Sequence, residues 1–553
     1  MRNKFLVILG FSLFLAVALR SQEVYQHVTT TNVYDYLDEL ANNKIIEINS
    51  VVLPYSRTFI AGKLSEALKL SQQLNKRQLK ELNFYLLEYK LEIDSLPDYK
   101  KLNFFKKKKH LATSINPLGG FYKDKLFTMA VKPIWGINYF INDNGSIYHR
   151  WGGAEAYAYI GEHWGLYTSL RDNNETKMIS NYNYFTLREG GAYKPTNKGG
   201  GDYSEMRGGV TYSWKWGSIG LVKDHLTWGN NYHGANILTD RAPSFAQIKF
   251  RAKPAKWFEL NYFHGWLVSM EVDSVRSDFD TDPINPRIIF RPKYIAANMF
   301  TFTPWKRLNI SVGNSIVYSD MNVHPAYLIP VLFYKSVDHT LNQGIDNQNS
   351  QMFFDVSSRQ IKHLHLYGTL YIDELKVERI TNDTLYNFWS LKLGAKVSNF
   401  LINNLSLNAE YTMATPITYQ HRVPTLTFES NYYNMGHYMR DNSQEIYLSA
   451  EYKLLRGLHL KAYYLLAQHG PDYEYDINDP DENVDQHPFM ERVAWQNQSI
   501  SFKATYEFIS NAFLFFEFIN SDISGDQDQV ELYTPEFFRG QNNTISAGFN
   551  IGF

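Results

Sequence analysis

The sequence predicts a mainly β fold: a large antiparallel β-barrel that spans a membrane, with an N-terminal helical bundle before it. From Thr544 to Phe553, every odd position is apolar and every even position is small or polar. Side chains on a strand alternate between two faces, so this segment has one face suited to lipid and one suited to water. The alternation recurs along most of the chain. Aromatic residues form 16% of the chain, which is typical of barrels with aromatic girdles at both membrane interfaces.

Residues 1–21 have the features of a secretory signal peptide. Arg2 and Lys4 give a positive start, and an apolar stretch runs from Phe5 to Leu19. That stretch is too short for a comfortable membrane anchor, and no other run of about 18 apolar residues exists. We therefore expect an exported protein whose strands do any membrane crossing.

Residues 22–110 are predicted to form the helical region. Apolar residues recur at helical spacing from Val33 to Ala41, and Thr31 or Asn32 can cap that helix. Further helices are predicted after Ser56 and after Asn75. The side chains expected to be buried in these two helices are Phe59, Ile60, Leu64 and Leu68, and then Leu79, Leu82, Leu86 and Ile93. Because the region precedes the first strand of an exported chain, we expect it in the periplasm, packed on the barrel.

Residues 111–553 are predicted to form the barrel. Alternating segments are separated by turn clusters such as Asn142–Gly145 and Asn403–Asn404, which suit tight hairpins. At roughly 10 residues per strand plus turns and longer outer loops, about 16 to 20 strands fit. Further examples of the alternation are the segments around Ile310–Tyr318, Leu364–Ile372, Leu405–Met413, Ile446–Leu454 and Ile500–Phe508.

Composition excludes several functional classes. Lys and Arg number 55 against 56 Asp and Glu, so the net charge of −1 gives no support for nucleic acid as a partner. The chain has no Cys, which excludes disulfides and thiolate metal sites. We found no phosphate-binding loop, zinc helix or nucleophile elbow. We therefore expect no enzyme activity, cofactor or metal site.

Several motifs recur in a characteristic order along the chain. They are the segments Asn116–Gly120, Gly217–Gly229, Asn230–Gly234, Ala235–Pro243, Pro330–His339 and Gly344–Asn349. Together these segments resemble motifs of the Wzi-like capsule-assembly family. That resemblance implies an outer-membrane barrel of about 18 strands with a periplasmic helical bundle. It also implies a surface lectin that helps to attach capsular polysaccharide, and not an enzyme.

Sugar recognition needs flat apolar rings, planar hydrogen-bonding groups and, for anionic glycans, Arg or Lys. One stretch combines these types, and we interpret it as a glycan-facing or lumen-occluding loop, or else as a turn with a Trp anchored at the membrane interface. Its candidate residues are Trp228, Asn230, Asn231, Tyr232, His233 and Arg241.

Two further groups are weaker candidates for glycan binding. Asp346, Asn347 and Asn349 lie near Gly344 and would otherwise be a turn scaffold. Arg287 and Arg291 would form an anion-facing patch.

The expected partners are surface polysaccharide, outer-membrane lipid and the barrel assembly machinery, the last through the strand that ends at Phe553. The main alternative function is a general diffusion porin or substrate channel of the outer membrane, which also needs a polar lumen and aromatic belts. Conductance in planar bilayers would separate the two functions.

Overall fold

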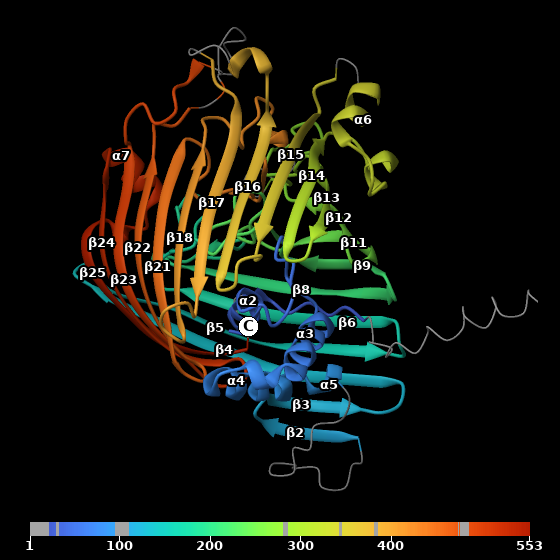
Figure 1. Cartoon of the computed structure of the whole chain (residues 1–553). Coiled ribbons are helices and arrows are strands. Elements are labelled where there is room, and N and C mark those ends of the chain that lie inside the picture. The colour runs from blue at the N-terminus through green and yellow to red at the C-terminus, as the bar shows by residue number, and fades with distance from the viewer. Residues whose placement is uncertain are drawn as a thin grey trace, which may run out of the picture.

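The computed structural model describes residues 22–28, 32–93, 110–279, 286–341, 345–380, 385–473, 475 and 486–552. Its dominant feature is a closed antiparallel barrel of 18 strands with helices before it (Figure 1). The predicted fold class is confirmed. The proposed signal segment 1–21 and Phe553 lie outside the described residues.

The barrel closes between its first and last long strands, β4 and β25, whose register runs from Ile545 opposite Ile141 to Ile551 opposite Trp135. A hairpin of β2 (Leu111–Ile115) and β3 (Leu118–Lys123) adds to the start of β4. The strands of the barrel are β4 (Phe127–Asn142), β5 (Gly145–Ile160), β6 (Trp164–Glu175), β8 (Gly201–Trp214), β9 (Gly217–Asp224), β11 (Phe245–Ala255), β12 (Phe258–Leu267), β13 (Lys293–Trp305), β14 (Leu308–Ser319), β15 (Gln348–Ser358), β16 (Leu364–Glu374), β17 (Phe388–Ser398), β18 (Leu405–Ala414), β21 (Ser443–Leu455), β22 (Leu458–His469), β23 (Trp495–Ile509), β24 (Ala512–Gly525) and β25 (Gly540–Ile551).

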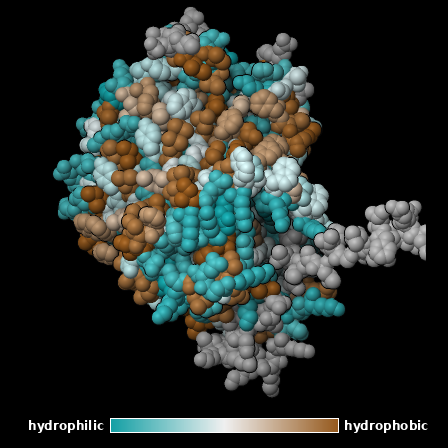
Figure 2. Space-filling model, viewed as in Figure 1, coloured by the Kyte–Doolittle hydropathy of each residue, from teal (hydrophilic) through white to brown (hydrophobic). Residues whose placement is uncertain are grey.

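The alternation decides which face of each strand is buried. On β25, Thr544 and Ser546 are buried in the lumen, whereas Ile545 is 45% exposed on the outer wall. Phe502 on β23 and Leu407 on β18 are exposed outward in the same way. Figure 2 accordingly shows hydrophobic residues spread over the barrel wall. Lipid can cover such a wall, while polar side chains that face the lumen find hydrogen-bond partners there.

The two ends of the barrel differ in their connections. One end, the short-turn end, has tight connections such as 214–217, 305–308 and 455–458. The opposite loop end carries long connections, which contain α6 (Tyr334–Leu341) and α7 (Gln527–Tyr533) (Figure 1). The predicted hairpin at Asn142–Gly145 is also at the loop end, where the two residues pair directly.

The helical region packs at the short-turn end. It consists of α2 (Val33–Asn42), α3 (Arg57–Lys69), α4 (Lys76–Glu88) and α5 (Lys90–Ile93) around a common apolar core. The side chains of Ser56 and Asn75 cap α3 and α4 as their positions predict. Asn32 precedes α2 but makes no side-chain cap bond. None of the described helices is long and apolar enough to cross a membrane.

The predicted buried face of these helices is wrong at three positions, since Leu68, Leu79 and Ile93 are all exposed. Helix α4 instead buries a largely polar face that includes Arg77, Glu81 and Glu88. The reason is the surface on which the helix packs: the turns and inner wall of the barrel mouth are polar. The Arg77 guanidinium, for example, donates to Asn404 Oδ1 at 2.9 Å, and Glu88 pairs with Lys132 of β4.

Candidate functional site

Residues 225–244, here called the lumen plug, leave β9 and fold back inside the barrel. Within the plug, β10 (Thr227–Trp228) pairs with β1 (Val52–Leu53) of the N-terminal region. Trp228 is 2% exposed and packs edge-on against Phe263 of the barrel wall. The plug, the N-terminal strand and loop 415–442 share one apolar core with inward-facing wall residues. The lumen is therefore occupied by packed side chains at this level.

Asn230 fixes the plug to the wall. Its backbone N–H and its side-chain amide both donate to the carboxylate of Asp355 on β15, at 2.9 and 2.8 Å. Ser50 of the N-terminal region contacts the Asn230 side-chain oxygen from the other side. This bidentate contact holds the plug in a defined position, because each buried group would otherwise lack a partner.

Tyr232 joins the plug to a buried ion-pair network. Its hydroxyl donates to Asp38 of α2 at 2.7 Å. Asp38 also pairs with Arg359 at 2.7 Å and with Lys396 at 2.9 Å. Burial by itself would raise the pKa of Asp38, but Lys396 and Arg359 hold that pKa well below its usual range. Helix, plug and barrel thus meet at one carboxylate.

His233 and Arg241 complete the contacts of the plug. His233 stacks on Tyr447 at 4.2 Å and pairs with Glu445 at 3.0 Å. The buried Arg241 guanidinium donates to backbone carbonyls of loop 176–200, including that of Tyr182 at 3.1 Å. It also donates to the Tyr438 carbonyl at 3.2 Å. Burial lowers the pKa of Arg241 to about 10.

The structure thus brings five of the predicted site residues into contacts inside the lumen, and the sixth, Asn231, donates to the Gly229 carbonyl of the same segment. Trp228, Asn230 and Arg241 are almost fully buried. Their observed contacts are with protein groups, and the prediction that they bind glycan stays a prediction.

The other predicted residues lie apart from the plug. Asp346 is at the loop end, where its carboxylate accepts from Arg422 Nε at 2.6 Å. Asn347 accepts from the Ser319 amide through its backbone carbonyl, and Asn349 is buried on β15 beside Leu426. Arg287 and Arg291 are exposed in loop 268–292, and Arg291 pairs with Asp320 at 3.1 Å.

A cleft at the loop end, here called the loop cleft, was not predicted. It has a volume of about 300 Å³ and is formed by loop 415–442, the start of loop 470–494 and α7. Four tyrosines line it: Tyr419, Tyr473, Tyr475 and Tyr533. The Tyr473 ring stacks on His487 at 4.2 Å, and its hydroxyl donates to Glu491 at 3.1 Å.

Polar groups complete the loop cleft. Beside the tyrosines, the cleft is lined by two amides, two arginines and three carboxylates: Gln420, Asn434, Arg422, Arg440, Glu429, Asp441 and Asp472. Arg422 is 68% exposed, so its ion pair with Asp346 is screened by water and readily exchanged. Aromatic rings beside amides and guanidinium groups are the side chains that a sugar polymer with anionic groups requires.

The comparisons with known proteins agree with this geometry at the level of the fold. No family model and no curated protein matches the sequence. Among solved structures, the chain is similar to Wzi of Escherichia coli, described as an outer-membrane protein involved in group 1 capsule assembly and a carbohydrate-binding β-barrel. The TM-score is 0.55 at 11% identity, and the match covers 96% of this chain and 100% of Wzi. The two proteins share a fold.

Lower similarity is found to two other barrels. OccD3 of Pseudomonas aeruginosa has 10% identity and a TM-score of 0.43, covering 76% of this chain and 90% of its own. OccAB2 of Acinetobacter baumannii has 10% identity and a TM-score of 0.42, covering 76% of this chain and 97% of its own. The likeness to Wzi supports the resemblance predicted from the motifs at the level of the fold.

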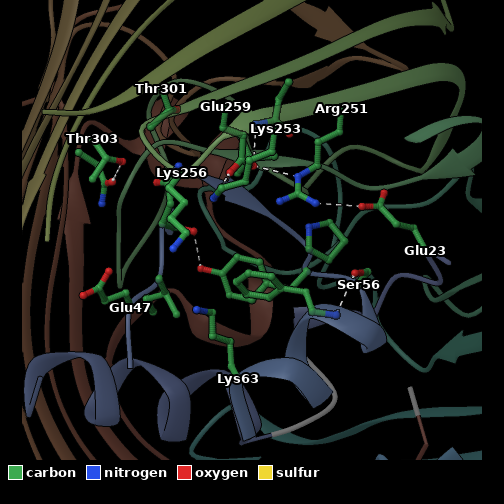
Figure 3. Close-up of a pocket in the computed structure, with 18 of the residues that line it drawn as sticks. Glu23, Glu47, Ser56, Lys63, Arg251, Lys253, Lys256, Glu259, Thr301 and Thr303 are labelled. Carbon is green, nitrogen blue, oxygen red and sulfur yellow. Dashed lines mark hydrogen bonds and ion pairs between the residues drawn. The ribbon is translucent and has the colours of Figure 1, made fainter. Parts of the chain in front are cut away.

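A second cavity, of about 390 Å³, opens at the short-turn end between α3, the N-terminal segment and strands β11 to β14 (Figure 3). Its charges are largely paired among themselves. Arg251 contacts Glu23 at 3.0 Å and Glu259 at 2.9 Å, and Lys253 also pairs with Glu259. Six Lys or Arg and four Glu line this cavity, whereas two Arg line the loop cleft together with Glu429, Asp441 and Asp472.

The loop cleft is expected to be sensitive to pH through Asp441. Burial, reinforced by Asp472, raises the pKa of Asp441 to about 6. Its carboxyl group accepts from the Ile417 amide and from Gln420, each at 2.8 Å. Because the folded pKa is raised, the contribution of Asp441 to stability is fully present below the unfolded pKa of about 4. That contribution is lost as the pH rises through about 6, by roughly 3 kcal/mol in total.

Hydrogen exchange tests this prediction. After correction for intrinsic rates, protection of the Ile417 amide should fall between about pH 4 and pH 7. The Asp441→Asn variant should show a flat profile. The Phe428 amide, which donates to the Tyr419 carbonyl in the same loop, is the internal control. Protection that increases with pH in the unaltered protein would be inconsistent with a raised pKa.

Proposed function

We propose that this chain is an outer-membrane barrel that binds and anchors surface polysaccharide at its loop end. The loop cleft is the observation that carries the proposal. Tyr473 and Tyr475, which are half-buried, offer apolar ring surface for the C–H faces of sugars, and the half-buried Gln420 offers an amide group for hydroxyls. The likeness to Wzi, itself described as carbohydrate-binding, supports the same class of ligand.

In this proposal the exposed Arg422 is the group that receives an anionic sugar substituent, while Arg440 and the carboxylates of Glu429, Asp441 and Asp472 line the rest of the cleft. Arg422 is held by Asp346 on one side only and is otherwise open to solvent. Arg440 contacts Asn183 through one nitrogen at 3.2 Å. A carboxylate on a sugar ring would compete with Asp346 for the Arg422 fork, because a bidentate contact is stronger than a screened surface pair. We therefore assign Asp346, among the residues singled out in the sequence, to the border of the binding site.

The lumen plug supports an anchoring role over transport. Through Arg241, its buried contacts join loop 176–200 to loop 415–442, and so hold one wall of the loop cleft in place. In this proposal Trp228, Asn230, Tyr232 and His233 act by keeping the lumen filled and the loop cleft rigid. The short-turn end and the helices of residues 22–110 would face the periplasm, and the long loops the outside.

The binding test uses the purified full chain in detergent or nanodiscs and polysaccharide extracted from the surface of its own host. Replacing both Tyr473 and Arg422 by Ala should weaken binding by about 10-fold or more, since a stacked ring and a charged hydrogen bond each contribute on the order of 1 kcal/mol. Arg276→Ala is the matched control, because Arg276 is an exposed loop-end arginine paired only with nearby Asp273. Equal binding by the double variant and the control would refute the loop cleft as the binding site.

A further inference from the structure

Two histidines and a glutamate from distant parts of the chain meet inside the barrel. One ligand atom from each of His27, Glu189 and His225 lies within 4.8 Å of the other two. Both imidazoles are almost fully buried, and the Glu189 side chain is 12% exposed. The distance from His27 Nε2 to Glu189 Oε1 is 3.2 Å. Ligand atoms around a tetrahedral zinc ion are separated by about 3.4 Å, so small side-chain movements would suffice.

A second carboxylate lies beside His225. Glu205 of β8 is buried, and its Oε1 lies 3.5 Å from His225 Nε2, so a side-chain movement would bring it to an ion held by the other three. Glu189 Oε1 is buried, lies 3.2 Å from His27 Nε2 and accepts no hydrogen bond within the described part of the chain. The other oxygen of Glu189 is occupied by Arg171 at 2.5 Å. One oxygen of the Glu189 carboxylate therefore lies beside the two imidazoles.

The charge of this pocket also suits a cation. The carboxylates of Glu189 and Glu205 would balance a divalent ion, and a third carboxylate, that of the half-buried Asp240, interacts electrostatically with Glu189 and His225. Arg171 is paired with Glu189 and Arg207 with Asp224 at 3.3 Å.

We propose that His27, Glu189 and His225, completed by Glu205, bind a divalent transition-metal ion of the zinc class. Imidazole and carboxylate are ligands that zinc prefers, and four protein ligands make a closed, structural site. The site would join the N-terminal segment, loop 176–200, the lumen plug and β8. A bound ion would therefore hold the plug in place through His225, in addition to the contact between Asn230 and Asp355. Most of these residues lie far apart in the sequence, so the site leaves no short metal-binding motif there.

The structure brings together one other group of this kind, Asp35, Glu451 and His459, among the residues that it describes. There, His459 Nδ1 already shares a proton with Glu451 at 3.0 Å, and Lys453 donates to the backbone carbonyl of Asp35 at 3.2 Å. This group carries no comparable proposal.

The test is direct binding of Zn²⁺ to the full chain in detergent after treatment with a chelator. We expect one tightly bound Zn²⁺ per chain by calorimetry and by elemental analysis. Because loss of an outer-shell partner already costs about 10–100-fold in affinity, His225→Ala should weaken binding by more than about 100-fold. Glu189→Gln, which keeps the side-chain shape, should also weaken binding. His110→Ala, which removes an exposed imidazole, should leave it unchanged.

The heat-dependent mobility of each variant on gels shows whether it has folded. When Co²⁺ replaces Zn²⁺, the protein should show the visible absorption of a tetrahedral cobalt site. Should His225→Ala misfold, Glu189→Gln decides the question alone. Absence of stoichiometric binding, or binding that is unaffected by Glu189→Gln, overturns the proposal. Because the readout is the metal itself, this result is independent of whether the loop cleft binds polysaccharide.

Discussion

Replacing residues 225–244 by an Asn-Gly turn is expected to convert the barrel into an open channel. Asp224 and Phe245 lie directly opposite each other on β9 and β11, so a two-residue turn can join the strands without changing the barrel. The deletion removes Trp228 and its apolar neighbours from the lumen. Barrels of 16–18 strands leave an aqueous channel unless something fills them, and ion conductance in planar bilayers should increase by about 10-fold or more.

A matched control exists on the next hairpin. Leu267 and Lys293 are also direct partners, and the same turn can replace loop 268–292, which is of similar length. The described residues of that loop, 268–279 and 286–292, are not part of the apolar core in the lumen. This variant should conduct like the unaltered protein. If the unaltered protein already carries a large steady current, the plug does not occlude the lumen and the diffusion porin becomes the better account.

Asp38→Ala is expected to be the most destabilising single substitution that we consider. It removes the shared partner of Arg359 and Lys396, both buried, and the acceptor of the Tyr232 hydroxyl. Loss of one partner of a buried ion pair leaves uncompensated charge, at a cost of about 3–5 kcal/mol. The midpoint of urea unfolding in lipid vesicles should fall accordingly.

The control for Asp38 is Glu66→Ala in the same helical region. Glu66 forms a partly exposed pair with Lys63, one turn away on α3, and such pairs contribute about 0–1 kcal/mol. Equal stability of the two variants would show that Asp38 does not join the helices to the barrel.

The sequence predicted those features that depend on local pattern. The alternation on β25 correctly separates Ile545, on the outer wall, from Thr544 and Ser546 in the lumen. Ser56 and Asn75 correctly mark the starts of α3 and α4, because a cap bond joins residues three apart.

Features that depend on distant partners were not predictable in this way. Leu79 was expected to be buried because apolar residues usually form the packed face of a helix. The actual packing surface is the polar barrel mouth, which a pattern within α4 cannot reveal. The contact between Asn230 and Asp355, 125 residues apart, is of the same kind.

The loop cleft was missed for a related reason. Tyr419, Tyr473 and Tyr533 come from three separate connections, and each alone resembles an ordinary loop tyrosine. The sequence did contain one indication of the cleft: these tyrosines lie in the connections between strands. Aromatic residues of a barrel are otherwise expected in the strands, at the membrane interfaces. Once the strands are assigned, tyrosines left in several loops at one end indicate a binding surface.

The most direct test of polysaccharide anchoring is the distribution of polysaccharide between cells and medium in the host. A strain that lacks the gene is compared with the same strain carrying the unaltered chain, the Tyr473→Ala/Arg422→Ala variant or the Arg276→Ala control. The account predicts that the deletion and the double variant shed polysaccharide into the medium, whereas the unaltered chain and the control retain it on the cell. Retention by the deletion strain would contradict the account.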